Sequence, residues 1–201
     1  MLALVFAALA SPPDRLPPID QCTADHSFVA FRTELMQILA RRDAQGLLRI
    51  VADDVHASLG GDVGKSDFIA LWDLQRPRSS KVWGELGSAL QLGCTIRGGI
   101  ATVPSLGDQV GDLDPFETFV AMPGARLRAR PHARARLLGR LDWHVLAQVG
   151  TWDGGPWLHV RLVDGRSGYV FEPMVRSPIG YRAWFEKRGG RWVMAGFLAG
   201  D

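Results

Sequence analysis

The sequence predicts an α+β protein with a helical N-terminal module, a small antiparallel β-barrel, and a C-terminal β-hairpin packed back on the helices. Three observations support this prediction. Between residues 119 and 175, apolar side chains recur at every second position in short runs separated by turns such as Asp164-Gly165. Residues 28–39 repeat apolar side chains at helical spacing. Residues 181–198 form two aromatic-rich runs around Gly189-Gly190, and such a ribbon needs a surface to pack on.

The alternating stretch carries a family pattern in three segments. Residues 125–131 match an opening strand, and residues 137–141 match a second strand that contains a glycine. The closing pattern is formed by Trp157, Val160, Asp164, Gly165, Gly168, Tyr169 and Val170. In these positions, over a bit more than a quarter of the chain, the sequence resembles the bacterial SH3-like (SH3b) domain, a five-stranded barrel of exported bacterial proteins. The chain departs from that family at Trp143-His144, where a Lys-Gly turn is commoner.

The flanking parts show a weaker similarity. Two helices, a strand and a late aromatic hairpin resemble the nuclear-transport-factor-like cone fold in their order, without a shared motif. This resemblance implies that the hairpin lies against the helices and that a pocket can form between them.

We expect five segments along the chain. They are a signal peptide at 1–10, a proline-rich linker at 11–26, a helical module at 27–115, the SH3-like barrel at 117–176 and the hairpin at 178–201. The apolar run at the start is too short to span a bilayer and ends in Ala8-Leu9-Ala10, a typical cleavage site. It lacks a basic residue in front, so a short buried N-terminal segment remains the alternative.

Within the helical module, Ser27 is expected to cap a helix that runs to Arg41, and Asp43 to cap a second one. A strand is expected at 53–59, further helices after Ser66 and Ser79, and a short strand at 100–103.

The chain has two cysteines, Cys22 and Cys94. An even count behind an export-like N-terminus predicts that they form a disulfide, with two buried thiols as the alternative. Together with the apolar N-terminus, this favours a periplasmic or secreted protein without an integral membrane segment in the mature chain.

Composition and motifs exclude several functions. A hydrophobic fraction of 47% and a charged fraction of 22% are typical of a folded domain, and a net charge of +2 argues against a nucleic-acid partner. The sequence has no nucleophile elbow, zinc-protease helix, phosphate loop or dinucleotide fingerprint. Asp53-Asp54 with His56 is the nearest approach to an acid–histidine cluster, and a solvated strand end explains it better. We therefore expect no catalytic residues, no metal and no cofactor.

Two groups of side chains are candidates for ligand binding. Six arginines, at 126, 128, 130, 134, 136 and 140, follow one another without an intervening acid. Of these, Arg126, Arg128 and Arg130 are expected on one strand face, where they suit phosphate or carboxylate groups. An ordinary solvated face is the alternative. Aromatic side chains in or beside the barrel loops form the second group: Trp143, Trp152, Trp157 and Tyr169.

These observations predict a non-catalytic exported binding module of the bacterial cell envelope. The SH3-like resemblance implies peptide or peptidoglycan as the ligand, and the arginines add an anionic envelope polymer. The first alternative is a small-molecule binder or enzyme with a cone-shaped pocket between the N-terminal helices and the hairpin. The second alternative is a structural periplasmic subunit, favoured if the chain's own residues block the barrel groove.

Overall fold

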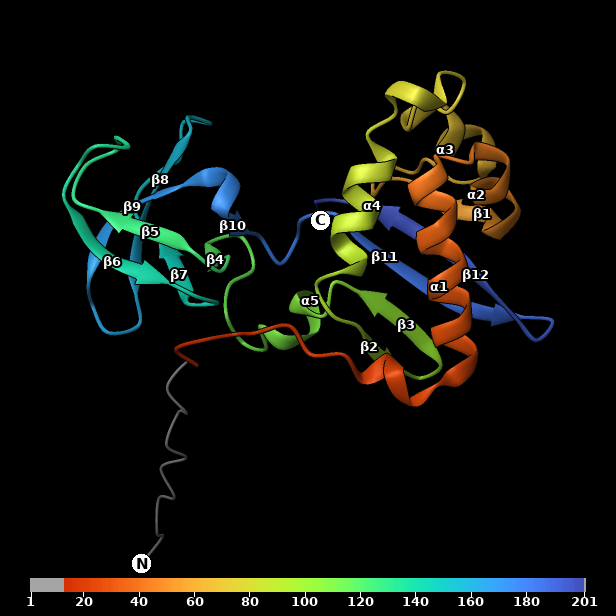
Figure 1. Cartoon of the computed structure of the whole chain (residues 1–201), viewed down its shortest axis with the longest axis horizontal. Coiled ribbons are helices and arrows are strands. Elements are labelled where there is room, and N and C mark those ends of the chain that lie inside the picture. Colours follow the sequence, from red (N-terminus) through yellow and green to blue (C-terminus); the bar gives the residue numbers. More distant parts are fainter. Residues whose placement is uncertain (1–12, 201) are drawn as a thin grey trace, which may run out of the picture. The chain divides into compact units, whose positions relative to one another are not determined.

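The protein is a mixed α+β chain with two β-sheets, as seen in a computed structural model that describes residues 13–200 (Figure 1). The predicted signal peptide at 1–10 lies outside the described residues. Among residues 13–200, none of the helices combines the length and the apolar composition needed to cross a bilayer.

The described chain forms two compact units. The first, here the α+β unit, contains residues 17–111 and 177–200. The second, here the β unit, contains residues 13–16 and 112–176. The β unit is therefore inserted into the sequence of the α+β unit, and each is described below by itself.

The α+β unit is built on a five-stranded sheet in the order β1-β12-β11-β3-β2. Strand β1 runs parallel to β12, and the other neighbours are antiparallel. The strands are β1 (Val51–His56), β2 (Thr95–Arg97), β3 (Ile100–Val103), β11 (Arg182–Arg188) and β12 (Arg191–Leu198). The late hairpin β11–β12 thus occupies the centre of the sheet, between elements from the N-terminal half.

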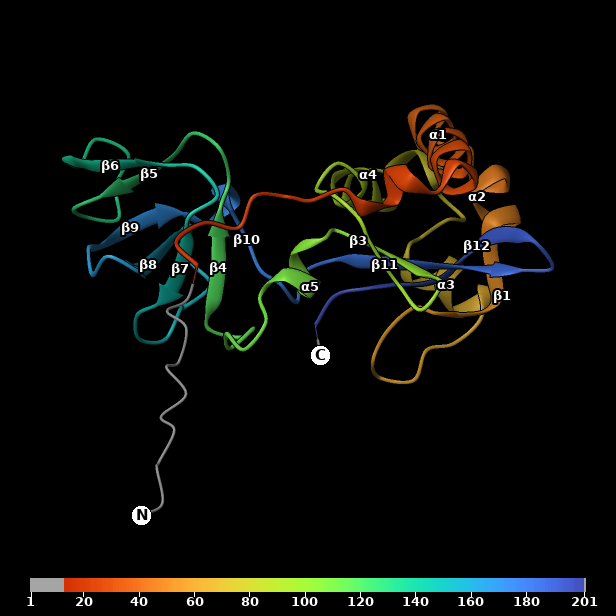
Figure 2. The same ribbon diagram turned by 90° about the horizontal axis from the view of Figure 1, so that it is seen from below.

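Helices α1 and α4 cover one face of this sheet, and Figure 2 shows them on the same side of β3 and β11. The helices are α1 (His26–Arg41), α2 (Ala44–Ile50), α3 (Lys65–Leu71), α4 (Val82–Leu90) and α5 (Leu106–Gln109), with 3₁₀ turns at Gln21–Ala24 and Pro77–Ser79.

The start of α1 differs from the sequence prediction. Asp25 is the N-cap, and its carboxylate accepts hydrogen bonds from the backbone N–H groups of Ser27 and Phe28. Ser27 is the second residue of the helix, where its hydroxyl accepts a hydrogen bond from the indole N–H of Trp192. Asp43 caps α2 as predicted, accepting from the N–H of Gly46.

Aromatic side chains join the hairpin to α1. The ring of Phe28 lies 5.7 Å from that of Phe185 and 5.0 Å from that of Trp192, and Phe31 lies 5.4 Å from Phe185. Phe28 and Phe185 are fully buried. The hairpin therefore packs on the N-terminal helices, as its aromatic content predicted.

The predicted disulfide is present. Cys22 and Cys94 are bonded, with Cα atoms 5.6 Å apart, and both side chains are fully buried. The bond joins the turn before α1 to the residue that precedes β2. It closes a loop that contains α1 to α4, so it constrains the helical layer of this unit.

The β unit is a seven-stranded antiparallel sheet in the order β10-β4-β7-β8-β9-β5-β6. Its strands are β4 (Thr118–Ala121), β5 (Ala125–Arg128), β6 (Leu137–Leu141), β7 (Val145–Gln148), β8 (Trp157–Leu162), β9 (Ser167–Phe171) and β10 (Val175–Arg176). The strands at the two ends of this order, β10 and β6, do not pair with each other. Strand pairing among the described residues therefore does not close this sheet into the expected barrel. The antiparallel strands are those that the alternation predicted.

One segment of the β unit comes from the predicted linker. Asp14 accepts a hydrogen bond through its carbonyl from the N–H of Val145, and the N–H of Leu16 donates to the carbonyl of Trp143. These residues continue the ladder beside β7. The proline content of this segment concealed the pairing, because prolines at 12, 13, 17 and 18 are typical of a linker.

Candidate binding groove on the beta unit

Strands β8 and β9 present one face to the core and one face to solvent. Leu158 and Val160 of β8 and Val170 of β9 are fully buried. The intervening side chains face outward in cross-strand pairs, because residues directly opposite each other share a face of the sheet. Trp157 lies opposite Phe171, and His159 lies opposite Tyr169. Tyr169 and Phe171, which continued the apolar alternation in the sequence, therefore belong to the outer face.

The outward aromatic pairs are in contact. The rings of Trp157 and Phe171 lie 5.6 Å apart at an angle of 57°. His159 stacks on Tyr169 at 4.6 Å, and its Nε2 lies 3.1 Å from the hydroxyl of Ser167. Both pairs are held by a regular ladder of five matched positions between the strands. The outer face is thus an ordered aromatic surface rather than a set of loop side chains.

Strand β5 adds arginines to the same face. Arg128 lies directly opposite Tyr169, which in turn lies opposite His159. The three side chains therefore form one row across strands β5, β9 and β8 on the outer face. Arg126 lies two residues earlier and shares the face of Arg128, because side chains alternate along a strand. Leu127, between them, is fully buried. This arrangement agrees with the predicted alternation of arginine and apolar side chains along the strand.

The close approach of β5 and β9 depends on a glycine. A Cβ atom at Gly168 would lie 2.6 Å from the carbonyl oxygen of Arg128 and 3.0 Å from the side chain of Leu127. No real Cβ tolerates the first distance. The glycine in the closing pattern is therefore required by the distance between two strands.

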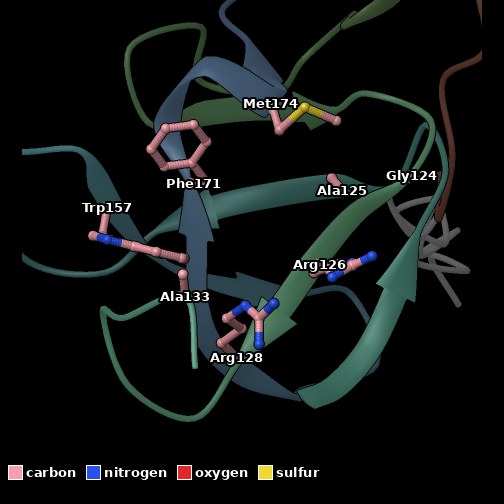
Figure 3. A pocket seen from close by; sticks show the side chains of 8 residues that line it. All are labelled: Gly124, Ala125, Arg126, Arg128, Ala133, Trp157, Phe171 and Met174. Carbon is pink, nitrogen blue, oxygen red and sulfur yellow. The ribbon is translucent and has the colours of Figure 1, made fainter. Parts of the chain in front are cut away.

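Aromatic and arginine side chains together line a groove of about 380 Å³ (Figure 3). Trp157 and Phe171 lie on one side, and Arg126 and Arg128 on the other. The remaining lining residues are Gly124, Ala125, Ala133 and Met174. The volume lies in the range of sites for small ligands, about 300–1,000 Å³.

Arg128 has a second function in the wall of the groove. Its Nη1 donates a hydrogen bond of 2.8 Å to the carbonyl of Ala135 and so holds the loop between β5 and β6. Ala133, from the same loop, forms part of the lining. Arg128 therefore shapes the groove, while its other N–H donors remain available to a ligand.

The arginines of this region have no carboxylate partner among residues 13–200. The ion pairs of the β unit lie elsewhere, between Arg15 and Asp142 at 3.6 Å and between Arg166 and Asp164 at 2.7 Å. The hydrogen bond from Arg166 is also the main reason why the pKa of Asp164 lies below its usual range. Asp142 and Asp164 are thus engaged by other arginines, and the charge of the arginine group is not neutralised by these pairs.

Not all predicted binding residues meet in the groove. Arg130 follows the end of β5 in an irregular segment and is exposed. Trp152 is exposed, and its indole N–H donates to the carbonyl of Gly155. Trp143 lies in the turn before β7 with a φ of 55°, outside the groove lining. Tyr169 lies in the next row of the outer face, and the groove lining instead includes Phe171 and Met174.

The carboxylates of the acid–histidine cluster, Asp53 and Asp54, each form an ion pair with a different basic residue. Asp53 lies 2.8 Å from the ammonium of Lys65, and Asp54 is bonded to Arg188. The hydrogen bond from Arg188 lowers the pKa of Asp54, so this carboxylate is kept ionised. Both acids are solvent-exposed as expected, but they lie in the middle of β1 and not at a strand end.

The described part of the chain offers little for a metal ion. Its group of potential ligands consists of Asp20, Cys22 and Cys94. Both sulfur atoms belong to the disulfide and therefore supply no thiolate.

Comparison with known proteins gives distant structural similarities. No family model and no curated protein matches the chain. A solved structure titled "putative ketosteroid isomerase", from Shewanella frigidimarina, is 10% identical, with 88% of this chain and 96% of that chain covered, at a TM-score of 0.31. An NTF2-like protein with a cystatin-like fold, from Novosphingobium aromaticivorans, is 14% identical, with 88% and 85% covered, at a TM-score of 0.30. We base the assignment of function on the side chains of this chain alone.

Proposed function

We propose that this protein is a non-catalytic, exported binding module of the bacterial cell envelope, and that its β unit is an SH3-like domain that binds peptide or a cell-wall ligand in the groove. The observation that carries the proposal is the open groove between the aromatic pair Trp157 and Phe171 and the unpaired arginines of β5. Aromatic faces bind apolar or sugar surfaces, and guanidinium groups bind anionic oxygens. A ligand that carries both an apolar or sugar surface and an anionic group can therefore contact the aromatic side and the arginine side of the groove.

The lining supports binding without catalysis. Among residues 13–200, arginine is the only ionisable residue type in the lining, and arginine stays protonated at all physiological pH values. Within this described range, the lining has no serine, cysteine, histidine, lysine or carboxylate that could act as a nucleophile or general base. The groove therefore offers orientation and charge, but no group that takes up a proton.

The two alternative functions have less support. A cone-shaped pocket between helices and hairpin would need space where Phe28, Phe31, Phe185 and Trp192 pack against one another. A structural subunit would be favoured by a groove filled by the chain's own residues, and among residues 13–200 this groove is open. Export itself is supported by the disulfide, which persists in oxidising compartments.

Binding of the full chain to purified peptidoglycan and to its soluble peptide and glycan fragments tests the proposal. Trp157→Ala should weaken binding by about tenfold or more, as expected for a central aromatic contact. Trp152→Ala is the matched control, because this exposed tryptophan lies outside the groove lining. Unchanged binding by Trp157→Ala, measured by sedimentation and calorimetry, would refute the groove as the binding site.

A further inference from the structure

The arginines beside the groove are arranged in adjacent rows of one sheet face. Arg126 on β5 is the register partner of Arg140 on β6, so the two side chains leave the sheet on the same face. Arg128 follows on the same face of β5, about 7 Å along the strand. Arginine side chains from two neighbouring strands, three in all, thus lie on one face of the sheet.

This arrangement costs folding free energy. Like charges directly opposite each other in a sheet are destabilising, and no ion pair within residues 13–200 neutralises Arg126, Arg128 or Arg140. A bound anion would remove the repulsion. The position of two of these arginines in the wall of an open groove shows where the anion can enter.

The hydrogen-bond donors specify the shape of that anion. A carboxylate is planar and is satisfied by the fork of a single guanidinium group. Arg126 and Arg128 line the groove from two positions on one strand, so two guanidinium groups are available to one anion. A phosphate group, with tetrahedral oxygens and up to two negative charges, accepts from both.

We propose, building on the proposed binding function of the groove, that its ligand is a phosphate ester of a sugar or polyol. The phosphate lies between Arg126 and Arg128, close to the charge of Arg140, and the carbon face of the sugar or polyol lies against Trp157 and Phe171. Met174 and Ala133 close the two ends of the contact surface.

The concave shape favours a soluble chain or small ester over a lipid surface. Arg126 and Arg128 lie in the wall of a groove of about 380 Å³, which a flexible chain can enter. The headgroups of a bilayer form a plane and reach a concave wall poorly. We therefore assign a soluble phosphate ester as the ligand, and test phospholipid vesicles as the rival source of phosphate.

The experiment measures binding of the full chain to three probes at constant ionic strength. They are poly(glycerol phosphate), poly-L-glutamate of equal total charge, and phosphatidylcholine vesicles that contain phosphatidylglycerol. We expect poly(glycerol phosphate) to bind at least about tenfold more tightly than poly-L-glutamate, because its glycerol carbons lie against Trp157 and Phe171 while its phosphate groups bind the arginines. Binding should weaken steeply with added salt.

Variants separate geometry from charge. Arg126→Gln should weaken binding of poly(glycerol phosphate) by about 10- to 100-fold, the loss expected for hydrogen bonds to a charged group. Arg126→Lys keeps the charge but loses the fork, so it should also weaken binding, though by less. Arg134→Gln removes the same charge from an exposed loop position outside the lining and should bind like the wild type.

The outcomes distinguish this inference from the function on which it rests. Equal affinity for poly-L-glutamate, or equal losses with Arg126→Gln and Arg134→Gln, would overturn the phosphate assignment. Binding to vesicles alone would overturn it as well. If Trp157→Ala still weakened binding of a peptide or glycan in those cases, the groove would remain the binding site. If no variant changed binding of any probe, both the phosphate assignment and the groove would be refuted.

Discussion

The carboxylate of Asp25 lies 3.1 Å from the ammonium of Lys187, across 162 residues of sequence. The same carboxylate caps α1 through the N–H groups of Ser27 and Phe28. One side chain therefore fixes both the start of the helix and its position on β11. The aromatic contacts of Phe28 with Phe185 and Trp192 lie next to this point.

This contact makes the stability of the α+β unit depend on pH. Hydrogen bonds from Ser27, then from Lys187 and the N–H of Phe28, hold the pKa of Asp25 well below its usual range. A lowered pKa in the folded state contributes stability above the unfolded pKa of about 3.9, and this contribution is lost as pH falls toward the folded pKa. Asp25→Asn should therefore be less stable than the wild type at pH 7, and the difference should shrink below about pH 4.

Urea unfolding at several pH values, followed by circular dichroism, measures this effect. Glu34→Gln is the control, since Glu34 is exposed on the same helix and has no recorded partner in residues 13–200. An Asp25→Asn variant with the same pH dependence as the wild type would contradict the prediction.

The disulfide should contribute strongly to the stability of the α+β unit. Its cysteines are separated by 72 residues, and closing a loop of that length stabilises a fold by about 4 kcal/mol in the chain-entropy model. Cys22→Ser with Cys94→Ser, or reduction of the wild type, should lower the free energy of unfolding accordingly. Chemical denaturation with and without reductant provides the measurement. The double variant should not respond to reductant, and an unchanged midpoint would show that the bond is not formed in solution.

The packing of the hairpin on α1 can be tested at Phe185. Removal of this fully buried ring leaves a cavity beside Phe28 and Phe31, so Phe185→Ala should destabilise the unit by about 3–5 kcal/mol. Phe116 is 54% exposed, and Phe116→Ala should change stability by less than about 0.5 kcal/mol. Thermal unfolding of both variants gives the comparison. Similar midpoints for the two would mean that the hairpin does not depend on this contact.

Two glycine-to-alanine substitutions should change the stability of the protein in opposite directions. Gly168→Ala places a Cβ 2.6 Å from the carbonyl oxygen of Arg128, so the strands must separate, at a cost of about 1–3 kcal/mol. Because Arg128 lines the groove, binding should weaken as well. Gly84→Ala, in the exposed first turn of α4, meets no atom within 4 Å and should stabilise the protein by about 0.4–1 kcal/mol. Calorimetric midpoints that move in the same direction would contradict this pair of expectations.

The periodicity of the sequence predicted which residues face the core, but not which outward rows become neighbours. Trp157 was a candidate for ligand binding, but its place in the SH3-like pattern favoured a core position, whereas the structure places it on the outer face of β8. Its contact with Phe171 depends on the register of β8 against β9, which follows from the length of the intervening turn. Phe171 and Met174 therefore escaped prediction as groove residues, although Trp157, Arg126 and Arg128 did not.

Local competition between side chains explains the other differences. Asp25 and Ser27 are both good capping residues, and the aspartate caps the helix while the serine hydroxyl accepts from Trp192. That indole comes from a hairpin far along the chain, so no local pattern contains it. The strand expected at 53–59 begins instead at Val51 and ends at His56, because its register is set by β12.

The insertion of residues 112–176 has a consequence for the order in which the protein is made. Strands β11 and β12 occupy the centre of the five-stranded sheet, yet they are synthesised after all the other elements of that sheet. The β unit has its own core and is complete at Arg176, so it can fold while the α+β unit still lacks its central strands. Until then, the apolar face of α1 has no aromatic partners from the hairpin. During this interval the N-terminal helices most need protection from aggregation.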